Sequence, residues 1–149
     1  MPRARPIAAT LGGSSDETET AFYDALQRGD LELLMSCWAD EEDIICVHPG
    51  GPRLVGAPAI RTAFEAMFAN GTVRARPSQV RRVQALTSAV HSVAEHVEVM
   101  LPDGMHRAIV IATNVYHKTP QGWRLVVHHA SAGVAEDVQA MQAQQPVLH

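Results

Sequence analysis

The chain has 149 residues, of which 46% are hydrophobic and 19% are charged, which is the composition of one folded globular domain rather than of a disordered protein. Its net charge of −4 argues against a nucleic-acid-binding surface, because phosphate contacts need clustered Lys and Arg. No apolar run approaches the roughly 20 residues of a membrane span, so no membrane partner is expected.

The N-terminal residues and the two cysteines indicate the cellular compartment of the protein. Residues 1–14 carry two early arginines and an apolar patch too short for a signal peptide, so they are expected to form a mobile tail. Cys37 and Cys46 show neither a CxxC pair nor a disulfide framework, which is typical of free thiols in a reducing compartment. A cytoplasmic protein is therefore expected.

Helical signals dominate the first part of the chain. Ser14-Ser15-Asp16 favours a helix start, and Glu17 and Glu19 suit the positive end of the helix dipole. Gly29 then breaks the helical period, and Asp30 can cap a second short helix that carries Trp38.

A strand and a third helix follow. The run DIICVHP, residues 43–49, is short and β-branched and predicts a strand that ends at Pro49. Pro58 suits the first turn of a helix, which is expected to end at Asn70-Gly71.

From residue 74 onward the apolar period changes to two, as in strands. Four long strands are predicted at 74–85, 90–101, 105–117 and 123–131, joined by hairpin turns into an antiparallel meander. After Gly133 the chain is weakly helical, Gln-rich and interrupted by Pro, so 134–149 is expected to be a frayed tail.

This arrangement predicts an α+β fold with a single domain over residues 15–133. A strongly curved antiparallel sheet of this kind can wrap the N-terminal helices, in the order α-α-β-α-β-β-β-β. The strands are apolar on both sides, so the outer face of the sheet is expected to bury itself against a second copy, giving a homodimer.

Polar residues on apolar strand faces are the first candidates for a site. Glu95 shares a strand face with valines, where desolvation would raise its pKa and make it a possible acid or base, unless it pairs with a cation such as Arg107. His128 and His129 are adjacent in the last strand, so they point to opposite faces, and a bulge would exchange them. Regular alternation groups His129 with Leu125 and separates both from His128.

The eight histidines raise the question of a metal site. Their positions show no ligand spacing such as HExxH, and adjacent histidines on one strand do not easily bind the same ion. Neither a metal ion nor another cofactor is expected.

Several segments in this order resemble a known family. They are AFYDALQRGDLELLMSCWADEEDIICVHPGGPRLVGAPAIRTAF, the strands that follow it, and GWRLVVHHAS, within about residues 16–133. They resemble the SnoaL-like branch of the superfamily of nuclear transport factors and ketosteroid isomerases, and the association domain of calmodulin-dependent kinase is similar around the last strand. The resemblance implies a cone of sheet and helices, a homodimer and a pocket inside the cone.

The resemblance also carries residue positions. His48 stands where the isomerases have the aspartate that acts as general base. A neutral imidazole can take that role, or His48 can simply hydrogen-bond the turn that ends the strand. Asn114 stands where they have an acid, eight residues before the turn at Gly122. Its amide can donate to a developing oxyanion, or it can be a satisfied buried amide that fixes a strand ladder or a neighbouring loop. Phe22 stands where they have a helical tyrosine, with Tyr23 one residue out of register, so steroid isomerisation is not predicted.

The remaining candidates would shape the pocket. By comparison with the kinase association domain, His128 is expected to face the pocket and His129 to face away. Trp38, Tyr116, Glu95 and Phe22 are expected to contact a small apolar or carbonyl-containing ligand.

Two functions stay open. The first is an isomerase, hydrolase or lyase that moves protons, with His48 as base and Asn114 as donor. The second is a noncatalytic ligand-binding or association domain. Since the family includes isomerases, epoxide hydrolases, polyketide cyclases, dehydratases and binding domains, the fold does not choose between them.

Overall fold

The computed structural model of the chain describes residues 12–71 and 73–143. Its helices are α2 (Ser15–Arg28), α3 (Leu31–Ser36), α4 (Ala57–Ala69) and α5 (Ala135–Ala143), and its strands are β1 (Ile45–Val47), β2 (Arg53–Val55), β3 (Val73–Gln84), β4 (Ser88–Leu101), β5 (Gly104–Thr119) and β6 (Gly122–Ala132). The α+β fold and the order of its main elements are confirmed. Strand β2 is an addition to the expected order.

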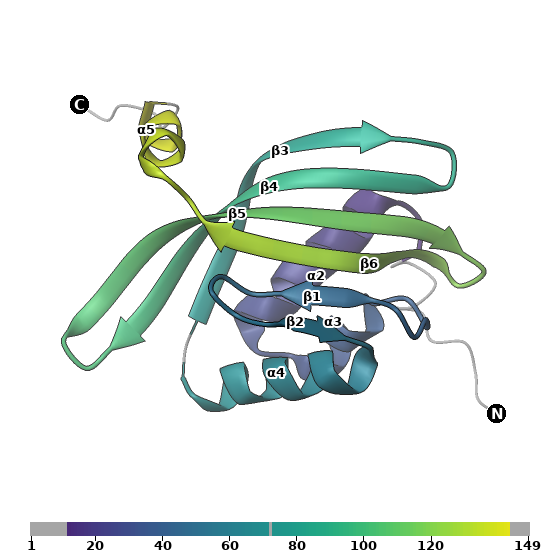
Figure 1. Cartoon of the computed structure of the whole chain (residues 1–149), viewed down its shortest axis with the longest axis horizontal. Helices are drawn as coiled ribbons and strands as arrows, with labels where there is room; N and C mark the ends of the chain where they lie inside the picture. Colours follow the sequence, from purple (N-terminus) through teal and green to yellow (C-terminus); the bar gives the residue numbers. More distant parts are fainter. Residues whose placement is uncertain (1–11, 72, 144–149) are drawn as a thin grey trace.

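All six strands belong to one sheet in the order β2-β1-β6-β5-β4-β3. The four long strands pair antiparallel, as expected, whereas β1 joins β6 in parallel. The sheet is strongly curved and not closed, and α2, α3 and α4 lie together on one side of it (Figure 1). Helix α5 lies apart from them, near the bend of the sheet (Figure 1).

Helices α2 and α3 each begin at a side-chain cap. The Ser14 hydroxyl accepts a hydrogen bond from the Glu17 amide, and the Asp30 carboxylate accepts one from the Leu33 amide, each at 3.1 Å. Gly29 ends α2 with a φ of 68°, which a residue with a Cβ rarely adopts. The break expected at Gly29-Asp30 therefore separates α2 from α3.

Two irregularities bend the long strands. The pairing of β3 with β4 shifts between Ser78 and Arg81, and Gln79 has a φ of 48° within this shift. In β6, Val127 pairs with Val115 and Leu125 pairs with Tyr116, so Val126 has no partner on β5. Both sites are bulges, which increase the local twist of a strand.

The bulge at Val126 corrects the alternation expected for the last strand. Tyr116 and Asn114 lie on one face of β5, and their partners on β6 are Leu125 and His128. Leu125 and His128 therefore share a face, although they are three residues apart. The expected grouping of Leu125 with His129 is wrong because one extra residue shifts the phase of the strand.

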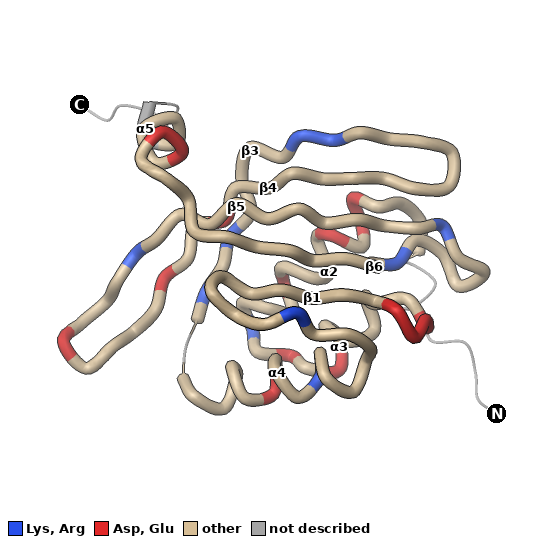
Figure 2. Tube along the Cα trace, viewed as in Figure 1, with Lys and Arg blue, Asp and Glu red and all other residues tan. Residues whose placement is uncertain are grey.

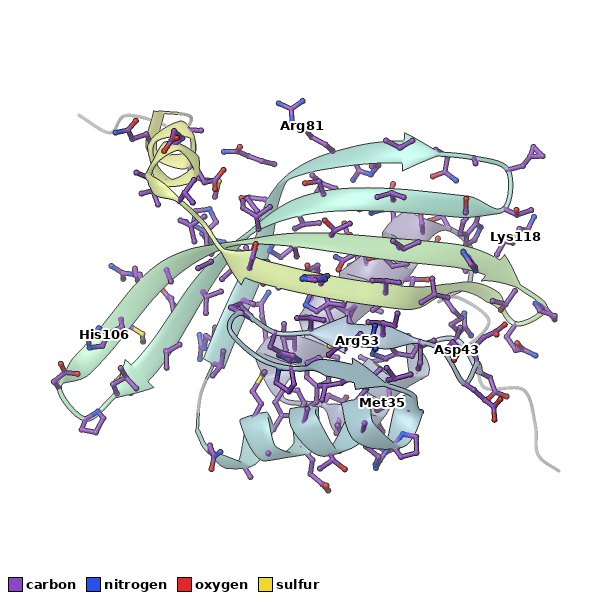
Figure 3. All side chains as sticks on the ribbon, in the orientation of Figure 1. Met35, Asp43, Arg53, Arg81, His106 and Lys118 are labelled. Atoms are coloured by element: carbon purple, nitrogen blue, oxygen red, sulfur yellow. The ribbon has the colours of Figure 1, made fainter. Side chains whose placement is uncertain are left out.

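The core fills the space between the sheet and the three helices. Its large buried side chains include Phe22, Leu34, Ile60, Phe64 and Leu125. Polar side chains such as those of Arg81, His106 and Lys118 lie at the periphery (Figure 3). None of the helices over 12–71 and 73–143 combines the length and apolar character needed to cross a membrane.

The structure describes only part of each of the two expected tails. Residues 1–11 of the expected N-terminal tail and residues 144–149 of the expected C-terminal tail lie outside the described residues. The described part of the expected C-terminal tail forms α5, and its Met141 side chain is buried.

Candidate functional site

A cavity of about 110 Å³ opens between the curved part of the sheet and helices α2 and α4. Its polar lining consists of His48, Glu95 and His128, and its apolar lining includes Leu26, Phe64, Met67, Val97, Val110 and Ala130. Half-buried His48 and exposed Pro49 are part of the lining, so the cavity reaches solvent at the end of β1. The curvature of the sheet thus brings β4, β6 and the segment after β1 to one site.

Glu95 is buried in this cavity, with 5% of its surface exposed. The Tyr23 hydroxyl donates a hydrogen bond of 2.7 Å to its Oε2. The pKa of Glu95 is raised from 4.5 to about 7, because burial, together with the smaller effect of the Glu19 charge, outweighs the opposing hydrogen bond from Tyr23. The alternative of an ion pair with Arg107 is wrong, because Arg107 pairs with Glu98 on the other face of β4.

Both cavity histidines are held in the neutral form. Burial, reinforced by His48 and His129, lowers the pKa of His128 to about 3, and burial also lowers the pKa of His48. Their ring centroids are 6.2 Å apart, and Nε2 of His128 lies 4.0 Å from Oε2 of Glu95. The polar groups of the cavity are therefore one carboxyl that titrates near neutrality and two uncharged imidazoles.

The two histidines of the last strand lie in different surroundings. His128 is 5% exposed and lines the cavity, whereas His129 is exposed on the outer face of the sheet. The bulge at Val126 lies before both residues, so it does not exchange them.

A second layer of polar residues lies behind the cavity wall. The Asn114 amide nitrogen lies 3.0 Å from the Tyr23 hydroxyl and 3.4 Å from Oε2 of Glu19. The same Glu19 oxygen accepts from the Tyr116 hydroxyl at 2.9 Å and lies 2.9 Å from Nδ1 of His91. Burial raises the pKa of Tyr23 and Tyr116 well above 10, so both hydroxyls keep their protons.

The other expected site residues fall outside the cavity lining. Asn114 and Tyr116 belong to the second layer, and both N–H groups of the Asn114 amide face Glu19 and Tyr23. Phe22 packs in the core, with its ring 5.2 Å from that of His128. Trp38 lines a separate surface hollow of about 470 Å³ between α3 and α4.

Glu19, Tyr23 and His91 were missed as site residues. Glu19 was expected to serve the helix dipole, but only 5% of its surface is exposed. Two patterns could have indicated them. Ser15, Glu19 and Tyr23 recur every four residues and so share one face of α2, and His91 shares a strand face with Glu95.

One part of the second layer has the composition of a metal site. Ligand atoms of Asp16, Glu19 and His91 lie within 4.8 Å of one another. Each already has a protein partner, since Asp16 pairs with Arg82 and Glu19 with His91. The Arg82 guanidinium supplies the positive charge that a cation would bring, so this cluster is accounted for by ion pairing.

Comparisons with known proteins place this geometry in a family. A family model described as the SnoaL-like domain matches residues 16–135. A suggested dehydratase of the NTF2-like family from Streptomyces avermitilis is 32% identical over 79% of this chain and 93% of its own, with a TM-score of 0.73. A suggested association domain of the calcium/calmodulin-dependent protein kinase type II kind, from Thiobacillus denitrificans, is 29% identical over 82% of this chain and 97% of its own, also with a TM-score of 0.73.

More distant structures agree in fold. A protein of unknown function with a cystatin-like fold from Nostoc punctiforme is 17% identical over 80% of this chain and 89% of its own, with a TM-score of 0.66. The comparison with curated proteins gave no match. The curved six-stranded sheet, the helices on its inner side and the family match over most of the sequence lead to one conclusion: the chain belongs to the SnoaL-like domain family of NTF2-like proteins.

Proposed function

We propose that the chain binds a small, neutral, carbonyl-containing molecule in the cavity and catalyses proton transfer on it, as an isomerase or lyase would. The observation that carries this proposal is the Glu95 carboxyl, with a pKa of about 7, beside two neutral imidazoles in an apolar cavity. Titratable groups whose pKa values are shifted toward neutrality by burial are typical of acid–base sites. The suggested dehydratase among the similar structures supports the same reaction class.

The charges around the cavity favour a neutral ligand. The lining residues within the described part of the chain include neither Lys nor Arg, and both lining histidines are neutral at pH 7. A carboxylate ligand would thus enter an apolar site without a cation and beside the buried acids Glu95 and Glu19, which is costly. The small volume further limits the ligand to a few heavy atoms beyond the reacting group.

In the proposed reaction, the protonated Glu95 carboxyl donates its proton to the carbonyl oxygen, and His48 takes a proton from the adjacent carbon. The products of this step are an enol, a Glu95 carboxylate and a His48 imidazolium, so charge and protons balance. For a β,γ-unsaturated ketone the enol is a dienol: the His48 imidazolium gives its proton to the γ-carbon and the enol hydroxyl returns its proton to Glu95, which completes an isomerisation. For a β-hydroxy ketone the β-hydroxyl leaves as water with the proton of the His48 imidazolium while the enol hydroxyl returns its proton to Glu95, which completes a dehydration. His48 suits the base role better than His128, whose pKa of about 3 makes it a weak base.

Proton transfer is tested by the exchange of the α-hydrogens of a ketone with solvent deuterium. Cyclopentanone is incubated with the protein in D₂O at neutral pH, and the loss of its α-proton signal is measured by NMR. Exchange above a buffer control is expected for the wild type and for His129→Ala, which removes an exposed histidine of the same strand. His48→Ala and Glu95→Gln are expected to lower the rate at least 10-fold. A wild-type rate equal to buffer would exclude this proposal for simple ketones.

A ligand with the same ring tests the charge argument. Cyclopentanecarboxylate is expected to bind at least 10-fold more weakly than cyclopentanone. Binding of each compound is measured from the shifts of the backbone amide NMR signals near Val110 and Ala130. Equal affinity for both compounds would show that charge does not govern entry.

A second candidate function, association, rests on the outer face of the sheet. One residue from each strand forms a continuous row across all six strands: Val83, Val90, Val115, Val127, Ile45 and Val55. Every member is β-branched and apolar, and Val83, Val90 and Val55 are 73%, 36% and 44% exposed. Lys and Arg are sparse along the central strands β5 and β6 (Figure 2). Such a row is suited to pairing with the same face of a second copy.

This association is tested by the solution mass of the protein. The wild type is expected to be a homodimer in light scattering after size-exclusion chromatography, and Val90→Lys is expected to be a monomer. Met105→Lys, which changes an exposed methionine away from the row, is the matched control and should remain dimeric. A monomeric wild type at micromolar concentration would remove association through this face.

A further inference from the structure

The orientation of the Asn114 side chain follows from its neighbours. A carboxylate oxygen only accepts hydrogen bonds, and Oε2 of Glu19 lies 3.4 Å from the amide nitrogen. The Tyr23 hydroxyl donates to Glu95, so it accepts from the same nitrogen at 3.0 Å. Both neighbours require the NH₂ end of Asn114 to face α2, which turns its carbonyl oxygen toward β6.

This carbonyl oxygen in turn fixes the proton of His128. Nδ1 of His128 lies 2.6 Å from Oδ1 of Asn114, and an amide oxygen cannot donate. Nδ1 must therefore carry the hydrogen. A neutral imidazole has a single N–H, so Nε2 is left with a free lone pair. Free neutral histidine favours the opposite tautomer, with the hydrogen on Nε2.

Nε2 of His128 is the atom available to a ligand. Its distance of 4.0 Å from Oε2 of Glu95 is too long for a hydrogen bond, and His128 lines the cavity. The pKa of His128 of about 3 means that no second proton occupies Nε2 at neutral pH. The cavity thus presents a hydrogen-bond acceptor here.

We infer that Glu19 is a positioning residue: through Asn114 it holds His128 in the Nδ1–H tautomer, so that Nε2 accepts a hydrogen bond from the ligand. The ligand class narrows accordingly to molecules with a hydroxyl or N–H donor next to the carbonyl that meets Glu95. The use of this tautomer rests on the proposed function, whereas the tautomer itself does not. His91 and Tyr116 keep the Glu19 carboxylate in place by bonding the same oxygen.

The tautomer is observable without any substrate. Long-range ¹H–¹⁵N NMR of the full ¹⁵N-labelled chain distinguishes a protonated from an unprotonated ring nitrogen, and exposed His129 provides an internal reference. His128 in the wild type is expected to show the Nδ1–H pattern at pH 7. A wild-type spectrum with the hydrogen on Nε2 would overturn the inference.

Two variants test the chain of contacts. In Glu19→Gln, an amide replaces the acceptor-only carboxylate, so Asn114 can flip and a measurable population of the Nε2–H form of His128 is expected. The matched control is Glu17→Gln, an exposed glutamate two residues earlier on α2, which should leave the wild-type pattern. A Glu19→Gln spectrum identical to that of the wild type contradicts the role of Glu19.

Asn114→Ala removes the acceptor itself and guards against a Glu19 variant that does not fold. His128 is then expected to shift toward Nε2–H, and retention of Nδ1–H would also overturn the inference. These outcomes are separate from the exchange assay with cyclopentanone. An Nδ1–H tautomer that responds to Glu19, together with no exchange, would leave the inference standing and remove only the proton-transfer reaction.

Discussion

The Glu95 carboxyl should make the stability of the protein fall as the pH rises. Its pKa is about 7 in the folded protein and near 4.5 in an unfolded chain, so between these values only the folded state holds the proton. Stability from this group is present below pH 4.5 and is lost as the pH passes through 7. Each pKa unit corresponds to about 1.4 kcal/mol, so the full loss is about 3 kcal/mol.

The Glu95→Gln variant isolates this effect. Glutamine keeps an oxygen that can accept from Tyr23 but has no proton to lose, so the variant lacks the pH dependence of this group. Between pH 5 and pH 8, its unfolding free energy should rise relative to that of the wild type by about 2 to 3 kcal/mol. Other groups, such as His128, titrate in both proteins, so they cancel in this difference to first order.

Urea unfolding followed by circular dichroism at several pH values measures the difference. Glu98→Gln is the matched control, since Glu98 lies on the opposite face of β4 and pairs with Arg107, and it should follow the wild type. If the difference between Glu95→Gln and the wild type stayed constant from pH 5 to pH 8, the Glu95 pKa would not be raised by burial. The acid role proposed for it would then fail.

Three further outcomes are expected. The rate of cyclopentanone exchange should follow a bell-shaped pH profile. It should fall above about pH 7 because Glu95 loses its proton, and it should fall in acid, below pH 6.5, because His48 gains one. A rate that keeps rising to pH 9 would contradict this assignment. Trp38→Phe should change the unfolding free energy by less than about 1 kcal/mol, because the buried indole N–H has no hydrogen-bond partner among the described residues and its removal offsets lost packing. A loss above about 3 kcal/mol in urea unfolding would refute this. Gly122→Ala should lower the thermal midpoint by an amount equivalent to about 2 kcal/mol or more, because Gly122 has a φ of 107° and a Cβ there would meet the backbone of Gly12; an unchanged midpoint would show that the Gly12 segment moves aside.

The sequence predicted the elements of the fold well because each long strand and helix has a strong period of its own. The meander could be read from alternation and turn residues, and the breaks at Gly29 and Asn70 from their capping chemistry. The bulge at Val126 could not be read, since each residue around it is a plausible strand residue. Its position depends on how β6 pairs with β5 and β1, which is a tertiary property.

The site was predicted in part. Glu95, His48 and His128 could be found because they are polar residues at identifiable strand or turn positions, and the structure brings them to one cavity. The place of Asn114 one layer deeper could not be deduced, because strand alternation gives the face of a residue but not its distance from a cavity. Glu19 was missed because an acid near a helix start usually faces solvent, and its burial follows only from the way α2 packs on the sheet.

The polar face of α2, formed by Ser15, Glu19 and Tyr23, also affects where along the sheet that helix packs. The hydrophobic effect is non-directional, so burial of the apolar residues of α2 does not by itself oppose a slide of the helix along the sheet by one turn, about 5.4 Å. The same slide would carry the Glu19 carboxylate away from its three donors and leave a buried charge unpaired, at a cost of several kcal/mol. Hydrophobic burial therefore holds α2 against the sheet, and the buried hydrogen bonds of Glu19 fix its position along the sheet.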